Sequence, residues 1–144
     1  MLQWSCSRLE ALGALALYEV LKLRSEVFVL EQQCIYLDPD GADLQAWHLL
    51  GRGEGGELQA YARLLEGPRI GRVLTAPGAR GAGQGRALMH EAIAHCERLW
   101  PGQPIELAAQ AYLQRFYASL GFEPTSALYE EDGIPHIDMK RPAQ

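Results

Sequence analysis

The feature that most constrains the fold is a glycine-rich loop that follows a strand-like segment and opens an amphipathic one. Residues 70–75 (IGRVLT) are short and apolar enough for a strand, and Ala76-Pro77-Gly78 closes them. Glycines then stand at positions 81, 83 and 85. Residues 84–99 are predicted to form a helix, because apolar side chains recur there at spacings of three and four: Leu88, Ala92, Cys96 and Leu99. The order strand, glycine loop, helix predicts a sheet with helices on its faces.

The glycine loop has the composition of an anion cradle. The first turn of a helix carries backbone N–H groups without internal partners and a partial positive charge. Glycines let that backbone approach a bulky anion, and Arg80 and Arg86 add positive charge. The loop lacks the Lys-Ser/Thr pair of a nucleotide P-loop, and its glycines do not fit the dinucleotide pattern G-x-G-x-x-G. A plain glycine-rich turn without a ligand is the alternative interpretation.

The rest of the chain continues the alternation of strands and helices. Residues 9–31 are predicted to form one long helical region broken near Arg24, although 27–30 (VFVL) also suit a strand. Residues 36–43 (YLDPDGAD) are expected to be loop because of their Asp, Pro and Gly content. A short helix is expected at 113–120, and further strands are expected at 2–5, 47–50, 58–65, 105–109, from 122 onward and at 137–140. This order predicts one mixed α/β domain over residues 1–144.

Composition bounds the class of protein. A chain of 144 residues with 48% apolar and 22% charged residues is typical of one globular domain. Its net charge of −5 excludes a broadly basic surface for nucleic acid, and no stretch approaches the ~20 apolar residues of a membrane span. The N-terminus lacks the pattern of a signal peptide. We therefore expect a soluble, cytoplasmic protein without nucleic acid or membrane as partners.

The potential metal ligands do not form a metal-binding pattern. The chain has three cysteines, Cys6, Cys34 and Cys96, and their spacing does not match that of zinc ligands. They are expected to be reduced, structural thiols. The chain has two acidic runs, and the first of them, over residues 38–43, lacks the twelve-residue ligand pattern of a calcium loop. Both acidic runs are expected to be solvated loops: Asp38-x-Asp40-x-x-Asp43 and Glu130-Glu131-Asp132. No metal is therefore expected.

Two motifs resemble the signatures of a known family. Arg80-x-x-Gly83-x-Gly85, with Pro77 three residues ahead, resembles the R/Q-x-x-G-x-G/A signature of the GNAT superfamily of N-acetyltransferases. Downstream, residues 117–122 (YASLGF) resemble the family's Y-x-x-x-G-F segment. The chain is also similar to the ElaA-like branch of this superfamily, through residues 23–32 (LRSEVFVLEQ), 70–73 (IGRV), 109–111 (AQA) and 129–139 (YEEDGIPHIDM).

The resemblance implies an α/β GNAT fold, with a twisted, mixed and mostly antiparallel sheet of about six to seven strands and helices on both faces. Two parallel strands, 70–75 and 105–109, would splay apart and admit acetyl-CoA as cosubstrate. Its pantetheine arm would pair with the backbone of Val73, Leu74 and Thr75. Gln110 stands where many members have an Asn that contacts acetyl-CoA. The pyrophosphate would lie on the loop formed by Arg80, Gly81, Ala82, Gly83, Gln84, Gly85 and Arg86.

The same resemblance implies a catalytic acid. Tyr117 matches a Tyr near the thioester sulfur, where a phenol would protonate the leaving CoA thiolate. An aromatic on the buried face of a short helix is the alternative interpretation. The general base is left open between Glu31 and His136, for which a solvated carboxylate and a backbone-bonded loop histidine are the alternatives. The remaining histidines are weaker candidates: His48, His90 and His95.

The expected function is therefore acetyl transfer from acetyl-CoA to an amine, by direct attack in a ternary complex without an acyl-enzyme. The acceptor is a small molecule or a peptide, and the acidic runs would favour a cationic amine if they lined its site. A non-catalytic acyl-CoA-binding or sensor module on the same fold is the main alternative. Acyl-homoserine lactone synthesis, suggested by residues 24–29 (RSEVFV), is a third. The resemblance is compatible with a homodimer.

Overall fold

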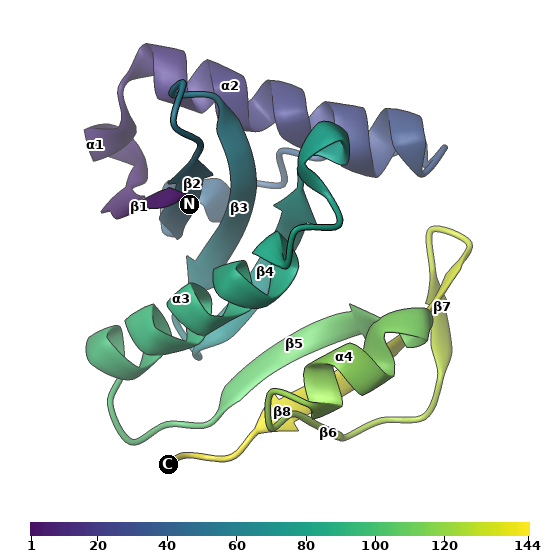
Figure 1. Ribbon diagram of the computed structural model, residues 1–144. Helices are drawn as coiled ribbons and strands as arrows, with labels where there is room; N and C mark the ends of the chain where they lie inside the picture. Colours follow the sequence, from purple (N-terminus) through teal and green to yellow (C-terminus); the bar gives the residue numbers. More distant parts are fainter.

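The sheet is the frame of the molecule, and a computed structural model describes it together with all of residues 1–144 (Figure 1). Its eight strands are β1 (Gln3–Arg8), β2 (Trp47–Arg52), β3 (Leu58–Leu65), β4 (Arg69–Thr75), β5 (Ile105–Gln110), β6 (Glu123–Pro124), β7 (Tyr129–Glu131) and β8 (Ile134–Arg141). The α-helices are α1 (Leu9–Leu12), α2 (Ala14–Arg24), α3 (Gln84–Leu99) and α4 (Gln114–Ala118). The other helical segments are the π-helix η1 (Ser25–Glu31) and the 3-10 turns η2 (Ala42–Leu44), η3 (Pro77–Ala79) and η4 (Ala111–Leu113).

The sheet is mixed, and one pair of strands parts within it. The strands follow the order β1-β2-β3-β4-β5-β8-β6, and β7 pairs with β8. All neighbours are antiparallel except β4 and β5, which are parallel and share a single facing pair, Arg69 and Glu106. Beyond that pair the two strands diverge (Figure 1). The structure confirms the mixed sheet with a splayed parallel pair. The sheet has eight strands rather than the expected six to seven, because β7 has only three residues and was not predicted.

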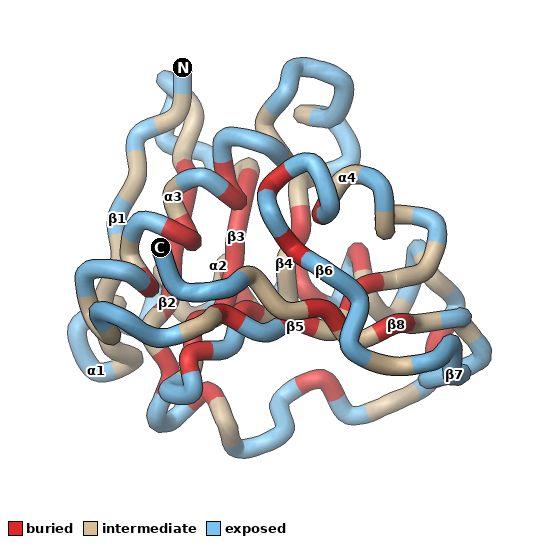
Figure 2. Tube along the Cα trace, turned by 90° about the horizontal axis from the view of Figure 1, so that it is seen from below, coloured by how far each residue is buried: buried red, intermediate tan, exposed pale blue.

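Helices cover both faces, each over its own apolar core. In β3, Ala60, Ala62 and Leu64 pack in the cluster that includes residues of α3 and α4, whereas Tyr61 packs in the cluster beneath α2. This alternation is that of a strand buried on both sides. Figure 2 shows the buried positions concentrated on the central strands and on the inner side of α3. The expected helix over 84–99 is confirmed with the same bounds.

A bulge in β4 sets the course of that strand. Tyr61 of β3 faces Leu74 and Arg63 faces Gly71, so β4 contains one residue more than β3 between these two pairs. Arg72 lies in the bulge with a φ of +50°, in the left-handed region that residues other than glycine rarely adopt. Because a bulged strand bends, β4 turns away from β5 along the part that has no partner on that side.

The long helical region near the N-terminus is confirmed, but the break expected near Arg24 is not: the chain stays helical there and changes only from α to π geometry. Helices α1 and α2 meet at Gly13, whose φ of +86° ends the first of them. From Ser25 to Glu31 the helix widens to π geometry, so that the N–H of Gln32 bonds the carbonyl of Val27, five residues back. None of the helices combines the length and apolarity that a bilayer crossing demands.

The last third of the chain departs most from the sequence expectation. The helix expected at 113–120 is split into η4 and α4, and the strand expected from 122 onward is only β6. The last strand begins at Ile134 rather than at 137, because β7 pairs with it in a hairpin. This hairpin brings Tyr129 opposite His136 and closes one side of the space between β4 and β5.

Candidate active site

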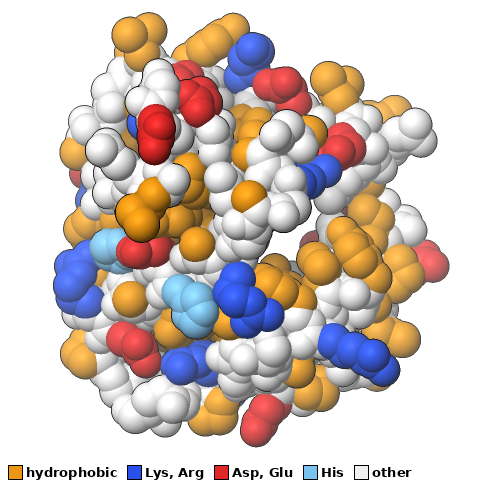
Figure 3. Space-filling model, viewed as in Figure 1, with side chains coloured by type: hydrophobic (Ala, Val, Ile, Leu, Met, Phe, Trp, Pro, Cys, Tyr) orange, Lys and Arg blue, Asp and Glu red, His pale blue; other side chains and the backbone are white.

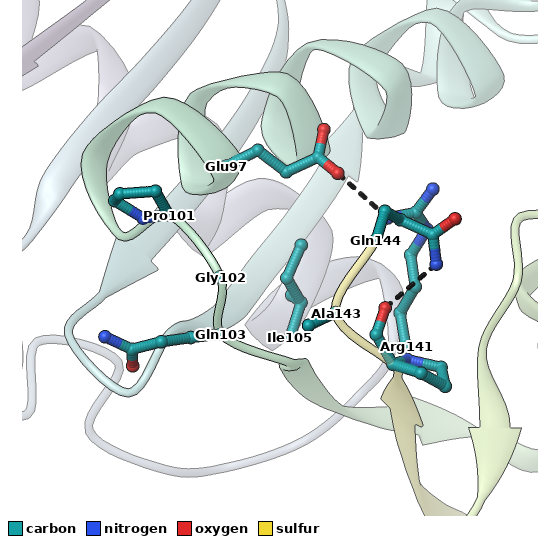
Figure 4. A pocket seen from close by; sticks show the side chains of 9 residues that line it. Glu97, Pro101, Gly102, Gln103, Ile105, Arg141, Ala143 and Gln144 are labelled. Atoms are coloured by element: carbon teal, nitrogen blue, oxygen red, sulfur yellow. Dashed lines mark hydrogen bonds and ion pairs between the residues drawn. The ribbon is translucent and has the colours of Figure 1, made fainter.

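A cleft of about 980 Å³ occupies the space between the diverging strands. Its lining comes from η1, the loop that follows it, β4, β5, the η4–α4 segment and the β7–β8 hairpin. Figure 3 shows the molecule hollowed between its two halves. A second hollow of about 270 Å³ lies at the C-terminus and shares no residue with the cleft (Figure 4). Only two of its nine lining residues are hydrophobic, and none is a predicted site residue.

The glycine loop forms one rim of the cleft. Gly81 and Gly83 have φ angles of +91° and +75°, which L side chains rarely adopt, and Gly83 caps the N-terminus of α3. The first backbone bond into the helix comes from the N–H of Ala87, so the amides of residues 81–86 make no hydrogen bond within the chain. A Cβ added at Gly81, Gly83 or Gly85 would meet no atom within 4 Å. The loop therefore presents free N–H groups over open space, as an anion cradle requires.

The edge of β4 forms the wall next to this rim. Val73, Leu74 and Thr75 all line the cleft, and β4 has no strand partner on the β5 side beyond Arg69. An unpaired strand edge offers backbone N–H and C=O groups to an extended ligand. The arrangement therefore suits a chain-like molecule that lies along β4 with a phosphate-bearing end at the glycine loop.

Tyr117 lies on the opposite wall, in α4. It is 6% exposed and makes edge-on contacts with Phe116 and Phe122, at ring-centre distances of 5.1 and 6.0 Å. Its hydroxyl has no hydrogen-bond partner in the chain and is not among the buried unpaired atoms, so it reaches the cleft that the residue lines. Burial raises the pKa of Tyr117 to about 12. The phenol is therefore protonated at neutral pH and can act as a proton donor.

His136 and Gln110 face each other across the β5–β8 pair, and both line the cleft. The Nδ1 atom of His136 lies 2.7 Å from the carbonyl oxygen of Ile134. Because a carbonyl only accepts, Nδ1 carries the proton in the neutral ring and Nε2 keeps a free lone pair. Nε2 lies 3.7 Å from the Glu131 carboxylate, and the ring stacks on Tyr129 at 6.0 Å. This geometry suits a proton acceptor whose charged form would be stabilised by Glu131.

Glu31 and Arg80 lie together at the mouth of the cleft. Nη1 and Nη2 of Arg80 donate to the two carboxylate oxygens of Glu31, each at 2.7 Å. The hydrogen bond from Arg80 lowers the pKa of Glu31. The Nε of Arg80 donates to the carbonyl oxygen of Thr75 at 3.3 Å. Two residues expected to have separate roles, one in catalysis and one in binding, are therefore paired.

The other predicted site residues lie at the rim or outside the cleft. Gly85 lines it, whereas Gly81, Ala82, Gly83, Gln84 and Arg86 do not. Arg86 instead donates to the Ser119 hydroxyl at 3.1 Å and lies over the Phe116 ring. Of the weaker candidates, His48 is 1% exposed and bonds Tyr61 and the backbone of Asp43. The other two, on α3, do not line the cleft: His90 and His95.

The expectation that the first acidic run is solvated is wrong for Asp38 and Asp43, whereas Asp40 is exposed. Asp38 and Asp43 are only 3% and 8% exposed, because arginines from three elements surround them. Arg24 has no exposed surface and donates from Nε to Asp38 at 2.8 Å and from Nη1 to Asp43 at 2.7 Å. The sequence signal for this pairing is that Arg24 and Arg63 stand within apolar stretches, where an arginine needs a buried partner.

The same network reaches the bulge in β4. Arg72 donates from Nε to Asp38 at 2.9 Å and from Nη2 to the backbone oxygen of Asp38 at 2.9 Å. Arg63 donates to Asp40 at 2.8 Å and to Asp43 at 3.2 Å. The three guanidinium groups of Arg24, Arg63 and Arg72 thus face three carboxylates, and the network is balanced in charge. It joins α2, the loop after η1, β3 and β4 at one end of the cleft, which Asp40, Arg63 and Arg72 line.

The second acidic run has a different environment. Glu131 and Asp132 are exposed, as expected, and both line the cleft. No group of three or more His, Cys, Asp or Glu side chains is arranged to hold a metal ion.

Comparisons with known proteins identify relatives of this chain. A family model for the acetyltransferase (GNAT) domain matches residues 39–142. Protein ElaA of Escherichia coli (strain K12) is 44% identical over 149 residues, covering 98% of this chain and 97% of the relative. UPF0039 protein sll0451 of Synechocystis sp. is 43% identical over 144 residues, covering 96% and 94%.

Two solved structures are similar to this chain over nearly its full length. An acyl-CoA N-acyltransferase from Pseudomonas aeruginosa has a TM-score of 0.93 at 43% identity, covering 98% of this chain and 99% of that chain. The crystal structure of Escherichia coli ElaA gives the same TM-score of 0.93 at 44% identity and the same coverage.

Proposed function

The chain belongs to the GNAT acetyltransferase family, and from this premise we propose that it transfers the acetyl group of acetyl-CoA to an amine within a ternary complex. The amine is carried by a small molecule or a peptide. The observation that carries the proposal is the single cleft that joins an unpaired β4 edge, a glycine loop with free amides and the hydroxyl of Tyr117.

Acetyl-CoA fits this cleft in chemistry and in shape. The pyrophosphate needs several N–H donors without other partners, and the amides of residues 81–86 supply them. The pantetheine amides need an unpaired strand edge, which Val73, Leu74 and Thr75 offer. Gln110, at the end of β5, offers an amide from the opposite wall. When bound, acetyl-CoA supplies an activated acetyl carbonyl and a thiolate leaving group.

Tyr117 is proposed as the general acid. Its protonated hydroxyl would donate to the sulfur as the carbon–sulfur bond breaks, so that CoA leaves as the thiol. The apolar contacts with Phe116 and Phe122 hold the ring and keep the hydroxyl neutral. Assistance of this kind is worth about 10²–10⁴-fold in rate.

His136 is proposed as the general base. Its Nε2 lone pair would take a proton from the acceptor ammonium, directly or through one water, and Glu131 would stabilise the resulting imidazolium. The backbone of Ile134 supports this role because it holds the other ring nitrogen in its protonated form. Glu31 is the less suitable base, since both of its oxygens already accept hydrogen bonds from Arg80.

Calorimetric titration with acetyl-CoA and CoA tests the proposal. Gly85→Trp would place a bulky side chain in the cleft. It avoids the backbone strain that a substitution at Gly83 would add, because Gly83 has a positive φ and Gly85 does not. Gly78→Trp is the matched control, since Gly78 is equally unobstructed but lies outside the cleft. We expect binding by the wild type and by Gly78→Trp, and its loss in Gly85→Trp. No binding by folded wild type would refute the proposal.

An amine panel then separates catalysis from binding alone. Release of free CoA thiol with at least one amine, and its loss in Tyr117→Phe, would support the transferase. Tight acetyl-CoA binding without transfer to any amine would favour the acyl-CoA-binding or sensor module instead.

A further inference from the structure

The Glu31–Arg80 ion pair joins the end of η1 to the start of the glycine loop at the mouth of the cleft. Glu31 is the last residue of η1, and Arg80 stands at the start of the glycine loop, 49 residues later in the chain. Both bonds are 2.7 Å long, and they pair the planar guanidinium with both carboxylate oxygens. A third bond, from Nε to the Thr75 carbonyl, ties the same guanidinium to the end of β4. Three of the five Arg80 donors are thus engaged, which holds the side chain in one orientation.

The contribution of this pair to the folding stability of the protein is too small to explain its presence. The side chains of Arg80 and Glu31 are 42% and 40% exposed, and an ion pair so open to solvent contributes only about 0–1 kcal/mol. The backbone that leads to Glu31 nevertheless departs from regular α-helical geometry. The helix that carries Glu31 runs through seven residues of π geometry, which is rare and recurs at functional sites. The wider turn changes the direction in which the last residue leaves the helix, and here that direction is toward Arg80.

On these grounds we propose that Glu31 is a positioning residue that holds Arg80 over the cradle for the acyl-CoA phosphates. Two Nη–H groups of Arg80 stay free of the bonds to Glu31 and Thr75, and they remain available to a phosphate oxygen. Glu31 acts through Arg80 and touches neither the sulfur nor the amine. The inference rests on the proposed function for the identity of the donor. It separates Glu31 from catalysis and assigns it to recognition of the phosphate end.

Glu31→Gln tests this role, with two acyl donors as probes. Acetyl-CoA carries the phosphates, and S-acetylpantetheine lacks them. We expect Glu31→Gln to raise the calorimetric Kd for CoA and the KM for acetyl-CoA about tenfold, the factor that one well-oriented charge-assisted contact contributes. We expect kcat, its pH profile and all constants for S-acetylpantetheine to stay unchanged.

The control variant is Glu19→Gln. Glu19 forms a similar two-point pair with Arg52, at 3.0 and 3.1 Å, with 42% and 28% of the two side chains exposed and outside the cleft. Its loss should leave CoA binding unchanged. A double variant adds a test of coupling: Glu31→Gln combined with Arg80→Gln should bind CoA no more weakly than Arg80→Gln alone, because both changes remove the same contact.

Three results would overturn the inference. An unchanged Kd for CoA in Glu31→Gln would remove its basis, and so would additive losses in the double variant. Equal losses of kcat with both donors, with an altered pH profile, would instead make Glu31 the base. Wild type that binds CoA but acetylates no amine would refute the proposed function, while the calorimetric comparison would still decide the role of Glu31.

Discussion

Replacing Arg24 with Met should destabilise the protein strongly, although Arg24 does not line the cleft. The side chain has no exposed surface and donates four hydrogen bonds to Asp38 and Asp43. Arg24→Met removes these bonds and leaves each carboxylate buried with fewer partners. Asp38 keeps Arg72 at 2.9 Å, and Asp43 keeps Arg63 at 3.2 Å. The loss should therefore be about 3 kcal/mol, the lower end of the range for breaking a buried ion pair.

This loss is large on the scale of the whole protein. For 144 residues the entropy of unfolding near the melting temperature is about 0.3 kcal/mol per kelvin, so a loss of 3 kcal/mol lowers Tm by about 10 °C. The matched control is Arg52→Met, because Arg52 makes a comparable two-point bond to Glu19 at the surface. That exposed pair is worth about 0–1 kcal/mol, which corresponds to at most about 3 °C.

Scanning calorimetry and urea denaturation measure the difference. The urea midpoint should fall strongly for Arg24→Met and only slightly for Arg52→Met, with the same m value in each, since unfolding exposes the same surface. Equal shifts for the two variants would refute the reasoning that burial makes the Asp38–Arg24–Asp43 contacts costly to break.

Three further predictions concern the cleft and its supports. Tyr117→Phe should lower kcat about 10²–10⁴-fold with the calorimetric Kd for CoA unchanged, because the ring packing survives and only the proton donor is lost; a parallel loss of CoA binding would contradict this. His136→Gln should lower kcat/KM for the amine, because the proposed proton acceptor is lost, and steady-state assays would measure this; an unchanged kcat/KM would assign the base elsewhere. Burial alone would raise the pKa of Asp40, but hydrogen bonds from Arg63 and the Ala42 N–H lower it from 3.8 to about 2. The ionised carboxylate therefore stabilises the native state above pH 4, and this stability is lost as pH falls toward 2. The urea midpoint of the wild type should fall more steeply over that window than that of Asp40→Asn, and parallel curves would exclude Asp40 as the cause.

Sequence periodicity predicted the elements whose pattern is set by one continuous core. Helix α3 was predicted with its exact bounds, because its apolar stripe is long and its ends are marked by Gly83 and by Trp100-Pro101-Gly102. The strands at 47–50 and 58–65 were predicted for a similar reason. Strand β7 was missed, because all three of its residues are exposed and its pairing with β8 leaves no apolar alternation.

The candidate site was predictable where a local motif carries the chemistry. The glycine loop and Tyr117 could be found because their residues are adjacent in the chain. The pairing of Glu31 with Arg80 could not, since 49 residues separate them and neither position is unusual for a solvated charge. The same holds for the hydrogen bond that fixes the tautomer of His136, because it depends on the turn of a hairpin that the sequence did not reveal.

Two irregular segments next to the cleft, the π-helix and the β4 bulge, are each connected to the same carboxylate, that of Asp38. Arg24 is the last residue of α2, immediately before the π-helix, and Arg72 occupies the β4 bulge with a positive φ. Both donate to Asp38, through bonds of 2.8 and 2.9 Å. The buried carboxylate of Asp38 therefore links the end of α2, where the π-helix that carries Glu31 begins, to the bulge in β4. Neither irregularity follows from local propensity, which favours continuing the α-helix and the regular strand. Ion pairs between residues far apart in the chain stand at both irregular segments: Arg24 and Arg72 each bind Asp38. The acidic run that was expected to be a solvated loop therefore supports the elements that line the cleft.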